Sequence, residues 1–193
     1  MAKNRKIEII KTAEKRFIKH GLNKTTLDEI ARDLRLGKST IYHYFESKEE
    51  LFYETIKNEI KEYTDGINLL LNSENGGLIQ SLKLYFQNKA ALKTKFPLVF
   101  QMFLLIISGR GNEIEIGLLK ELVSEEENKL SIFFQSFFKE NKPAKLSDTM
   151  DRKVVDISNY FLVFTELNEK TDPEHYVELL DKEIVFFLET LFP

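Results

Sequence analysis

One stretch of the chain, from Thr25 to Lys48, carries most of the side chains whose types and spacing suit binding to another molecule. Ile41 and Phe45 are four residues apart, so in a helix they share one buried face and their neighbours point outward. The outward side chains carry an ammonium, hydroxyls and an imidazole: Lys38, Ser39, Thr40, Tyr42 and His43. The ammonium can donate to guanine, hydroxyls can pair with several bases, and tyrosine and histidine suit phosphate oxygens. This pattern favours a surface that binds double-stranded DNA.

The residues before this segment predict a helix that would position it. Thr26 is a good N-cap, because its hydroxyl can accept from a first-turn amide. The apolar residues that follow recur at three- and four-residue spacing and therefore share one face: Leu27, Ile30, Ala31 and Leu34. Gly37 interrupts this pattern before the second apolar series begins. Two short helices joined by a tight turn indicate a helix-turn-helix, whose second helix presents its N-terminal residues to the major groove.

The stretch Lys38-Ser39-Thr40-Ile41-Tyr42-His43-Tyr44-Phe45, followed by Ser47-Lys48-Glu49-Glu50-Leu51, resembles the tetracycline-repressor (TetR) family of transcriptional regulators. The resemblance covers roughly residues 3–55. It implies a DNA-binding site made of Thr26, Lys38, Ser39, Thr40, Tyr42, His43, Tyr44 and Lys48, with Lys48 on a DNA phosphate. The family often has Gly where Arg35 stands and Ser or Thr where Gly37 stands. We therefore expect Arg35 to adopt the left-handed conformation that disfavours a side chain.

Charge is divided unevenly along the chain of 193 residues. Residues 1–48 hold twelve Lys and Arg against six Asp and Glu, a net of +6, whereas residues 49–193 hold sixteen against twenty-five, a net of -9. Basic N-termini are common, so this asymmetry alone decides little. Beside a helix-turn-helix, a basic N-terminal head on an acidic body is typical of nucleic-acid binding by the head only.

The composition argues against several other classes. The chain has no cysteine, which excludes disulfides and thiolate chemistry, and its three histidines (His20, His43 and His175) show no catalytic or metal-binding spacing. We therefore expect no enzyme, metal site or cofactor. The basic N-terminus lacks the apolar region of a signal peptide, and the apolar run from Leu98 to Ser108 is too short to span a bilayer. We expect a cytoplasmic protein.

The periodicity predicts an all-α fold of about nine helices, the first three of which form the DNA-binding head. The family resemblance implies that the remaining helical body binds a ligand and dimerises. We place the head at residues 1–49 and the body at 50–193. Four of the predicted helices cover residues 3–20, 78–93, 112–141 and 148–168. The others are the two short helices of the helix-turn-helix, a long helix after Ser47 with Leu70 on its apolar face, an apolar helix that restarts at Pro97, and a last helix after Asp172 with Leu191 on its apolar face. Gly21 should end the first helix, Ser47 and Glu50 should form a capping box, and Pro97 should begin a helix.

Three features of the body carry more specific expectations. The segment from Leu98 to Ile107 is apolar on all sides, which predicts complete burial. Glu125, Glu126 and Glu127 form a charge run that we interpret as a solvated face. Asp172 and Pro173 should cap and start the last helix.

The sixteen Phe and seven Tyr of the chain lie mostly after residue 50. They can simply fill a helical core, or some can line a ligand cavity between helices. The pocket candidates are Tyr85, Phe86, Phe100, Phe103, Phe133 and Phe161. The family resemblance implies such a pocket in the middle of the body, bounded by the long helix that begins near Lys48. Because few charges fall in the apolar stripes, we expect an apolar or aromatic small-molecule effector.

The last two helices are broadly apolar, and the matching pair in the TetR family forms a four-helix bundle with a second copy. The resemblance thus implies a homodimer that binds a palindromic operator, with recognition helices about 34–36 Å apart. A ligand-responsive repressor is the function it favours, in which the effector moves or stiffens the long helix and changes the distance between the heads. The alternative is a helical small-molecule-binding protein without DNA-binding activity.

Overall fold

The computed structural model describes residues 2–71, 77–138, 150–172 and 174–192. Within these ranges the protein is all-helical, as predicted, and ten helices are present. They are α1 (Ala2–Lys24), α2 (Leu27–Asp33), α3 (Lys38–Tyr42), α4 (Lys48–Leu71), α5 (Gly77–Ala90), α6 (Leu92–Lys95), α7 (Pro97–Ile107), α8 (Glu113–Phe137), α9 (Met150–Thr171) and α10 (Tyr176–Leu191). The short α6 is the element that the predicted nine helices lack.

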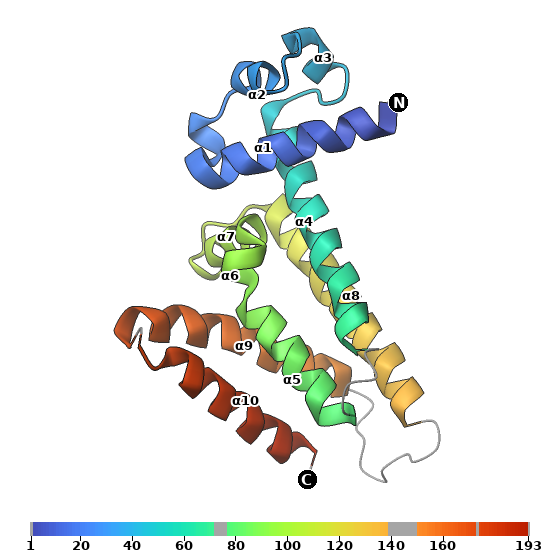
Figure 1. The fold of residues 1–193 in the computed structure, drawn as a ribbon, viewed down its shortest axis with the longest axis vertical. Helices are drawn as coiled ribbons and strands as arrows, with labels where there is room; N and C mark the ends of the chain where they lie inside the picture. The colour runs from blue at the N-terminus through green and yellow to red at the C-terminus, as the bar shows by residue number, and fades with distance from the viewer. Residues whose placement is uncertain (1, 72–76, 139–149, 173, 193) are drawn as a thin grey trace.

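Helices α1 to α3 form a head at one end of an elongated molecule (Figure 1). α1 packs across the start of α4, while α2 packs on both α1 and α3. The first helix bends at Gly21, whose φ of 74° lies outside the helical region, and one more turn follows it. Gly21 therefore marks a kink near the predicted helix end, and Leu22 after it packs partly buried against the core.

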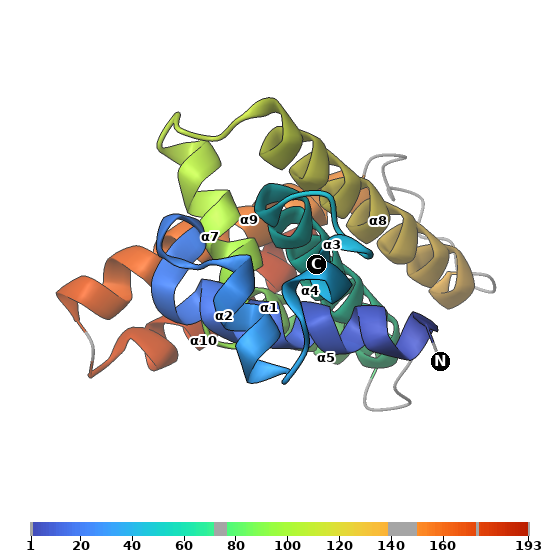
Figure 2. The same ribbon diagram turned by 90° about the horizontal axis from the view of Figure 1, so that it is seen from above.

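α4 connects the head to the body and runs from the head along α8 (Figure 1). α4 also packs on α5 and α7, α9 packs on α5 and α8, and α10 packs on α5 and α9. In the view from above, α1 and α2 lie over the top of the body (Figure 2). α1 also contacts α7 directly, so the head touches the body through α7 as well as through α4.

One hydrophobic core runs through both parts. It extends from Ile9 and Phe17 in α1, through Ile56 and Ile60 in α4, to Leu188 in α10. Because the core is continuous, α4 packs into both the head and the body and is not a flexible linker. No helix in the described part of the chain is long and apolar enough to cross a membrane.

Several predicted elements differ in detail. The predicted helix 78–93 is interrupted at Ala91, where α5 ends and α6 begins. α7 starts at Pro97 as expected, but it is buried only in its first half, and Ile107 is 55% exposed. α10 begins at Tyr176, and the side chain of its N-cap His175 makes no capping hydrogen bond. The predicted connector at 143–147 and the predicted helix start at Asp148 lie outside the described residues.

Candidate nucleic-acid interface

The start of α2 is fixed by a capping box. Glu29 donates its backbone N–H to the Thr26 hydroxyl at 3.3 Å, and the Glu29 carboxylate accepts the Thr26 N–H at 3.0 Å. The Thr26 hydroxyl also donates to the Glu29 carboxylate at 2.9 Å, and this hydrogen bond, together with that from the Thr26 N–H, lowers the pKa of Glu29 below its ordinary value. The structure thus confirms Thr26 as the N-cap.

The turn between α2 and α3 is held in a strained conformation. Arg35 has a φ of 54°, so the predicted left-handed residue is confirmed. Next to it, Leu36 donates its N–H to the Ala31 carbonyl at 2.8 Å. At the end of α2, Arg16 of α1 binds both carboxylate oxygens of Asp33, at 2.5 and 2.8 Å, and this contact lowers the pKa of Asp33. The bidentate ion pair fixes α2 on α1, and with it the direction of α3.

The side chains of α3 divide between the core and the surface as the spacing predicts. Ile41 and Phe45 are almost completely buried. α3 ends at Tyr42, but Phe45 still turns inward, because its N–H donates to the Ile41 carbonyl at 3.0 Å. The outer surface of α3 therefore remains available to another molecule.

Four of the eight predicted DNA-binding residues line one groove. Thr26 and Lys38 lie at the starts of α2 and α3, Tyr42 lies at the end of α3, and Lys48 lies at the start of α4. All four residues line this groove. Lys38 and Tyr42 are about half exposed, and Lys48 is partly buried. The groove thus brings two ammonium groups and two hydroxyls to one place, which suits contact with a DNA strand.

The other four predicted residues lie outside this lining. Ser39 and His43 are exposed, whereas Thr40 and Tyr44 are partly buried. Tyr44 packs against the hydrophobic core and meets the His43 ring edge-on, with ring centroids 5.3 Å apart. Tyr44 is thus the candidate most engaged with the protein itself.

The start of α4 is capped somewhat differently from the expectation. Ser47 accepts the Glu50 N–H through its hydroxyl at 3.0 Å, as predicted. The Glu50 carboxylate, however, accepts the N–H of Glu46 at 2.5 Å, one residue before the position that a capping box requires. The helix begins at Lys48, which therefore sits in the first turn with its side chain on the groove.

The six aromatic residues predicted to line a ligand pocket are all buried, but they fall into separate groups. Phe86 meets Phe161 edge-on at 5.2 Å, and Tyr85 lies beside Phe86 at 5.7 Å. Phe133 instead packs with Phe134 near the end of α8. The other two, Phe100 and Phe103, are on α7.

A buried polar cluster lies among these aromatic residues, and the sequence reasoning missed it. Glu126 of α8 is fully buried, so its interpretation as part of a solvated face was wrong. Its carboxylate binds the ammonium of Lys89 with two contacts of 2.7 Å and accepts hydroxyl hydrogen bonds from Tyr63 at 2.5 Å and Tyr85 at 3.3 Å. Tyr85 also shares a hydrogen bond of 3.0 Å with Ser158 of α9.

This cluster joins α4, α5, α8 and α9 at one point. Burial, together with the Glu126 carboxylate, raises the pKa of both Tyr63 and Tyr85 well above the ordinary value. Both phenols therefore stay protonated donors. The expectation that few charges fall in the apolar stripes is corrected here, because a complete ion pair occupies the interior of the body.

A second buried carboxylate ties α4 to α7. One oxygen of Glu59 accepts the backbone N–H groups of Leu98 and Val99, each at 3.0 Å, and so caps the first turn of α7. The other oxygen is buried without a hydrogen-bond partner. Burial, together with the nearby carboxylates of Glu14 and Glu62, raises the pKa of Glu59 to about 7, although the backbone N–H groups that it accepts lower it in part.

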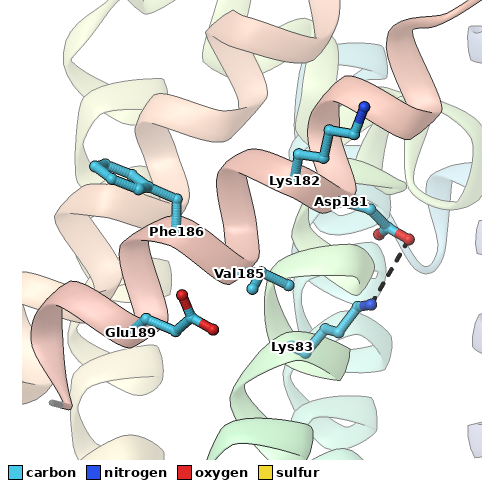
Figure 3. A pocket seen from close by; sticks show the side chains of 6 residues that line it. All are labelled: Lys83, Asp181, Lys182, Val185, Phe186 and Glu189. Atoms are coloured by element: carbon cyan, nitrogen blue, oxygen red, sulfur yellow. Dashed lines mark ion pairs between the residues drawn. The ribbon is translucent and has the colours of Figure 1, made fainter.

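A hollow on the body surface lies between α5 and α10 (Figure 3). Lys83 and Asp181 form an ion pair of 3.7 Å across it, and Gln87 donates to the same carboxylate at 2.9 Å. Phe186 points away from this ion pair, and its side chain is 63% exposed (Figure 3). The outer side of α10 thus presents an aromatic ring to solvent.

The tight turn, the outward donors of α3 and the long α4 joined to a helical body define a helix-turn-helix transcriptional regulator. Comparison with known proteins identifies the family. The profile of "bacterial regulatory proteins, tetR family" matches residues 9–55, which cover the capped α2, α3 and the start of α4. Residues 9–55 thus form a DNA-binding head of the type found in TetR-family transcriptional regulators.

Individual relatives show how far the similarity extends. The transcriptional regulator QacR of Staphylococcus aureus is 28% identical over 142 residues, 71% of this chain and 70% of QacR. The regulator YhgD of Bacillus subtilis is 41% identical over 68 residues, 34% of this chain, and the match spans about a third of YhgD (36%). The crystal structure of a transcriptional regulator from Cytophaga hutchinsonii superposes with a TM-score of 0.70 and 26% identity, covering 95% of this chain and 94% of that one.

Proposed function

We propose that the protein is a ligand-responsive repressor that binds a palindromic operator as a homodimer in the cytoplasm. In this proposal residues 1–49 bind DNA, and residues 50–193 bind the effector and dimerise. The observation that carries the proposal is the groove at the starts of α2, α3 and α4, where Lys38, Tyr42 and Lys48 converge. A negative regulator among the relatives, IcaR of Staphylococcus epidermidis, is 30% identical over 77 residues and supports repression rather than activation.

In the proposed complex, the residues of α3 and its neighbours have distinct roles. Lys38 and Ser39 read base edges in the major groove, with Thr40 beside them. Thr26, Tyr42, His43, Tyr44 and Lys48 bind phosphates and fix the register of the head on the duplex.

The test for these roles compares two lysines on the same helix. Lys48→Ala should weaken binding alike on all sequences and reduce the salt dependence by about one phosphate contact per head. Lys61→Ala, which removes an exposed lysine farther along α4, is the matched control and should change neither quantity. A change in sequence preference with Lys48→Ala would show that the phosphate role is wrong. If no genomic fragment bound the wild type in a salt-sensitive manner, the alternative of a small-molecule-binding protein without DNA activity would replace the proposal.

The proposed dimer interface is the outer surface of α9 and α10. Four apolar side chains are exposed there: Tyr160, Val163, Leu179 and Phe186. Because α9 and α10 pack together, these exposed apolar side chains suit association with a second surface. We expect Phe186→Asp to convert a dimer into a monomer in sedimentation at micromolar concentration. Ile132→Asp on α8, a similarly exposed apolar position, should leave the dimer intact. A monomeric wild type would contradict the two-headed geometry.

The proposed effector is an apolar or aromatic molecule held among α4, α5, α7, α8 and α9. Support comes from the buried aromatic residues Tyr85, Phe86 and Phe161 and from a protein with a similar fold. That protein, FadR of Bacillus subtilis, was solved with stearoyl-CoA; it is 14% identical, with a TM-score of 0.66 over 94% of this chain and 96% of that one. Thermal shift with acyl-CoAs and planar aromatic compounds tests the proposal: a binder should raise Tm and weaken DNA binding.

A further inference from the structure

The ammonium of Lys38, the first residue of α3, is held by the protein itself. Its Nζ lies 3.1 Å from the Oδ2 atom of Asp28 in the first turn of α2. The same Nζ lies 5.8 Å from the centre of the Tyr42 ring. Both Lys38 and Asp28 line the groove described above, and both side chains are about half exposed. A base-reading lysine thus carries an internal counter-ion at the surface that faces DNA.

The contact is not needed to hold the head together. Exposed ion pairs of this kind contribute little to stability. α2 and α3 are already joined by the buried side chains of Ile30, Ala31 and Ile41. The acidic first turn that favours α2 also contains Glu29, which closes the capping box. The Asp28 carboxylate therefore mainly affects how Lys38 binds DNA, and contributes little to the stability of the head.

Phosphate and guanine respond differently to this acid. Non-specific binding draws its affinity from lysines that neutralise phosphates and release counterions. Lys38 is already neutralised by Asp28, and a phosphate that approaches it also meets a carboxylate of like charge. A base edge is uncharged, and the ammonium has three donors, so Lys38 can keep Asp28 and still donate to guanine O6 or N7.

We propose that Asp28 is a specificity-determining residue of the DNA interface, because it reserves Lys38 for neutral base acceptors and withholds it from phosphates. This inference rests on the proposed roles of the groove. It assigns Asp28 no contact with substrate of its own; Asp28 is a positioning residue that acts through Lys38. Its removal should therefore raise affinity for random DNA while lowering sequence discrimination.

The experiment compares Asp28→Asn with a charge-matched control in the full-length protein. Glu46→Gln removes one negative charge from the same groove, and Glu46 is not the ion-pair partner of Lys38. Binding to a random-sequence duplex is followed by fluorescence anisotropy between 50 and ~200 mM KCl, the range over which phosphate contacts change affinity strongly. Selection from a randomised duplex library then gives the sequence preference of each variant.

Asp28→Asn should steepen the salt dependence on random DNA by about 0.9 per head, which corresponds to binding on the order of tenfold tighter at ~0.1 M salt. It should also reduce enrichment at the base positions that Lys38 reads. Glu46→Gln should leave the selected sequence unchanged. In a Lys38→Ala background, Asp28→Asn should have no effect on either measurement, because the residue that it frees is absent.

Four results would overturn the inference. Equal effects of Asp28→Asn and Glu46→Gln would show that only overall charge matters. Persistence of the Asp28→Asn effect without Lys38 would show that Asp28 acts directly. If Asp28→Asn selected the same sequence as the wild type and had the same salt slope, the role of Asp28 would be refuted, whereas the proposed function would stand. A wild type that selects no sequence would refute the proposed function together with it.

Discussion

The ion pair between Lys89 and Glu126 makes a quantitative prediction, because it is completely buried. Lys89→Met keeps the length of the side chain and leaves the Glu126 carboxylate without its cation. Breaking one side of a buried pair typically destabilises a protein by about 3–5 kcal/mol. For a chain of this size, this corresponds to a decrease in Tm of roughly 6–20 °C. Glu126→Leu should be similarly damaging, since it strands the ammonium of Lys89.

The double substitution should be much less harmful than the sum of the two. Lys89→Met with Glu126→Leu removes both charges, and such replacements are often neutral. The remaining penalty comes from the hydroxyls that Glu126 accepts. Tyr85 keeps its hydrogen bond with Ser158, whereas Tyr63 loses its contact with Glu126, which is worth about 1–3 kcal/mol when left unsatisfied. We therefore expect a coupling energy of at least ~3 kcal/mol between the two positions.

Urea denaturation followed by circular dichroism measures all three variants, with equal m-values as the condition for comparing them. Lys61→Met, which breaks an exposed pair with Asp65 on α4, is the control and should leave the free energy of unfolding unchanged. If the two single substitutions each changed stability by less than ~1 kcal/mol, or if their effects were additive, the pair would not be the buried electrostatic contact that the geometry indicates.

Three smaller predictions follow from single residues. Glu59 binds its proton more tightly in the native than in the unfolded protein, since burial raises its pKa from 4.5 to about 7. Wild type should therefore lose up to about 3 kcal/mol of stability relative to Glu59→Gln as pH rises from 4.5 to 7, and a pH-independent difference in urea melts would contradict this. Arg35→Gly should stabilise the protein by roughly 0.5–1 kcal/mol in thermal melts, because glycine adopts φ 54° freely; a loss would show that the Arg35 side chain compensates. Thr26→Ala should destabilise it by about 1 kcal/mol, and an unchanged melting curve would show that the capping box is dispensable.

The head was predictable because its signals are local. Thr26, Gly37 and Ser47 lie next to the helices that they begin, and a capping hydroxyl needs only the next turn of the same helix. The left-handed Arg35 was expected from the family resemblance, because glycine often stands at this position of the turn. The Glu50 carboxylate accepts the N–H of Glu46, one residue before the predicted position, because at a helix start two neighbouring amides compete for the same acceptor.

The buried charges of the body were harder to predict, although the sequence contains part of the signal. Glu126 lies four residues after Leu122 and four before Leu130, on the same buried stripe of α8. Because Glu125 and Glu127 flank it, Glu126 was interpreted as part of a solvent-exposed run of charges. The spacing alone could have placed Glu126 inside. The spacing could not identify the partner of Glu126, because Lys89 is on another helix. Only the packing of α4 and α9 against both α5 and α8 brings the two side chains together.

Two polar attachments on α4 bear on how an effector would act in the proposed repressor. Glu59 holds the first turn of α7, which also contacts α1 of the head, and Tyr63, one turn later, binds Glu126 of α8. Apolar contacts permit small shifts, whereas hydrogen bonds are directional and fix one register. A displacement of α7 or α8 by a ligand should therefore reach α4 first at these residues. Because α4 begins at Lys48 in the DNA groove, a rotation of this helix would move the phosphate contact itself.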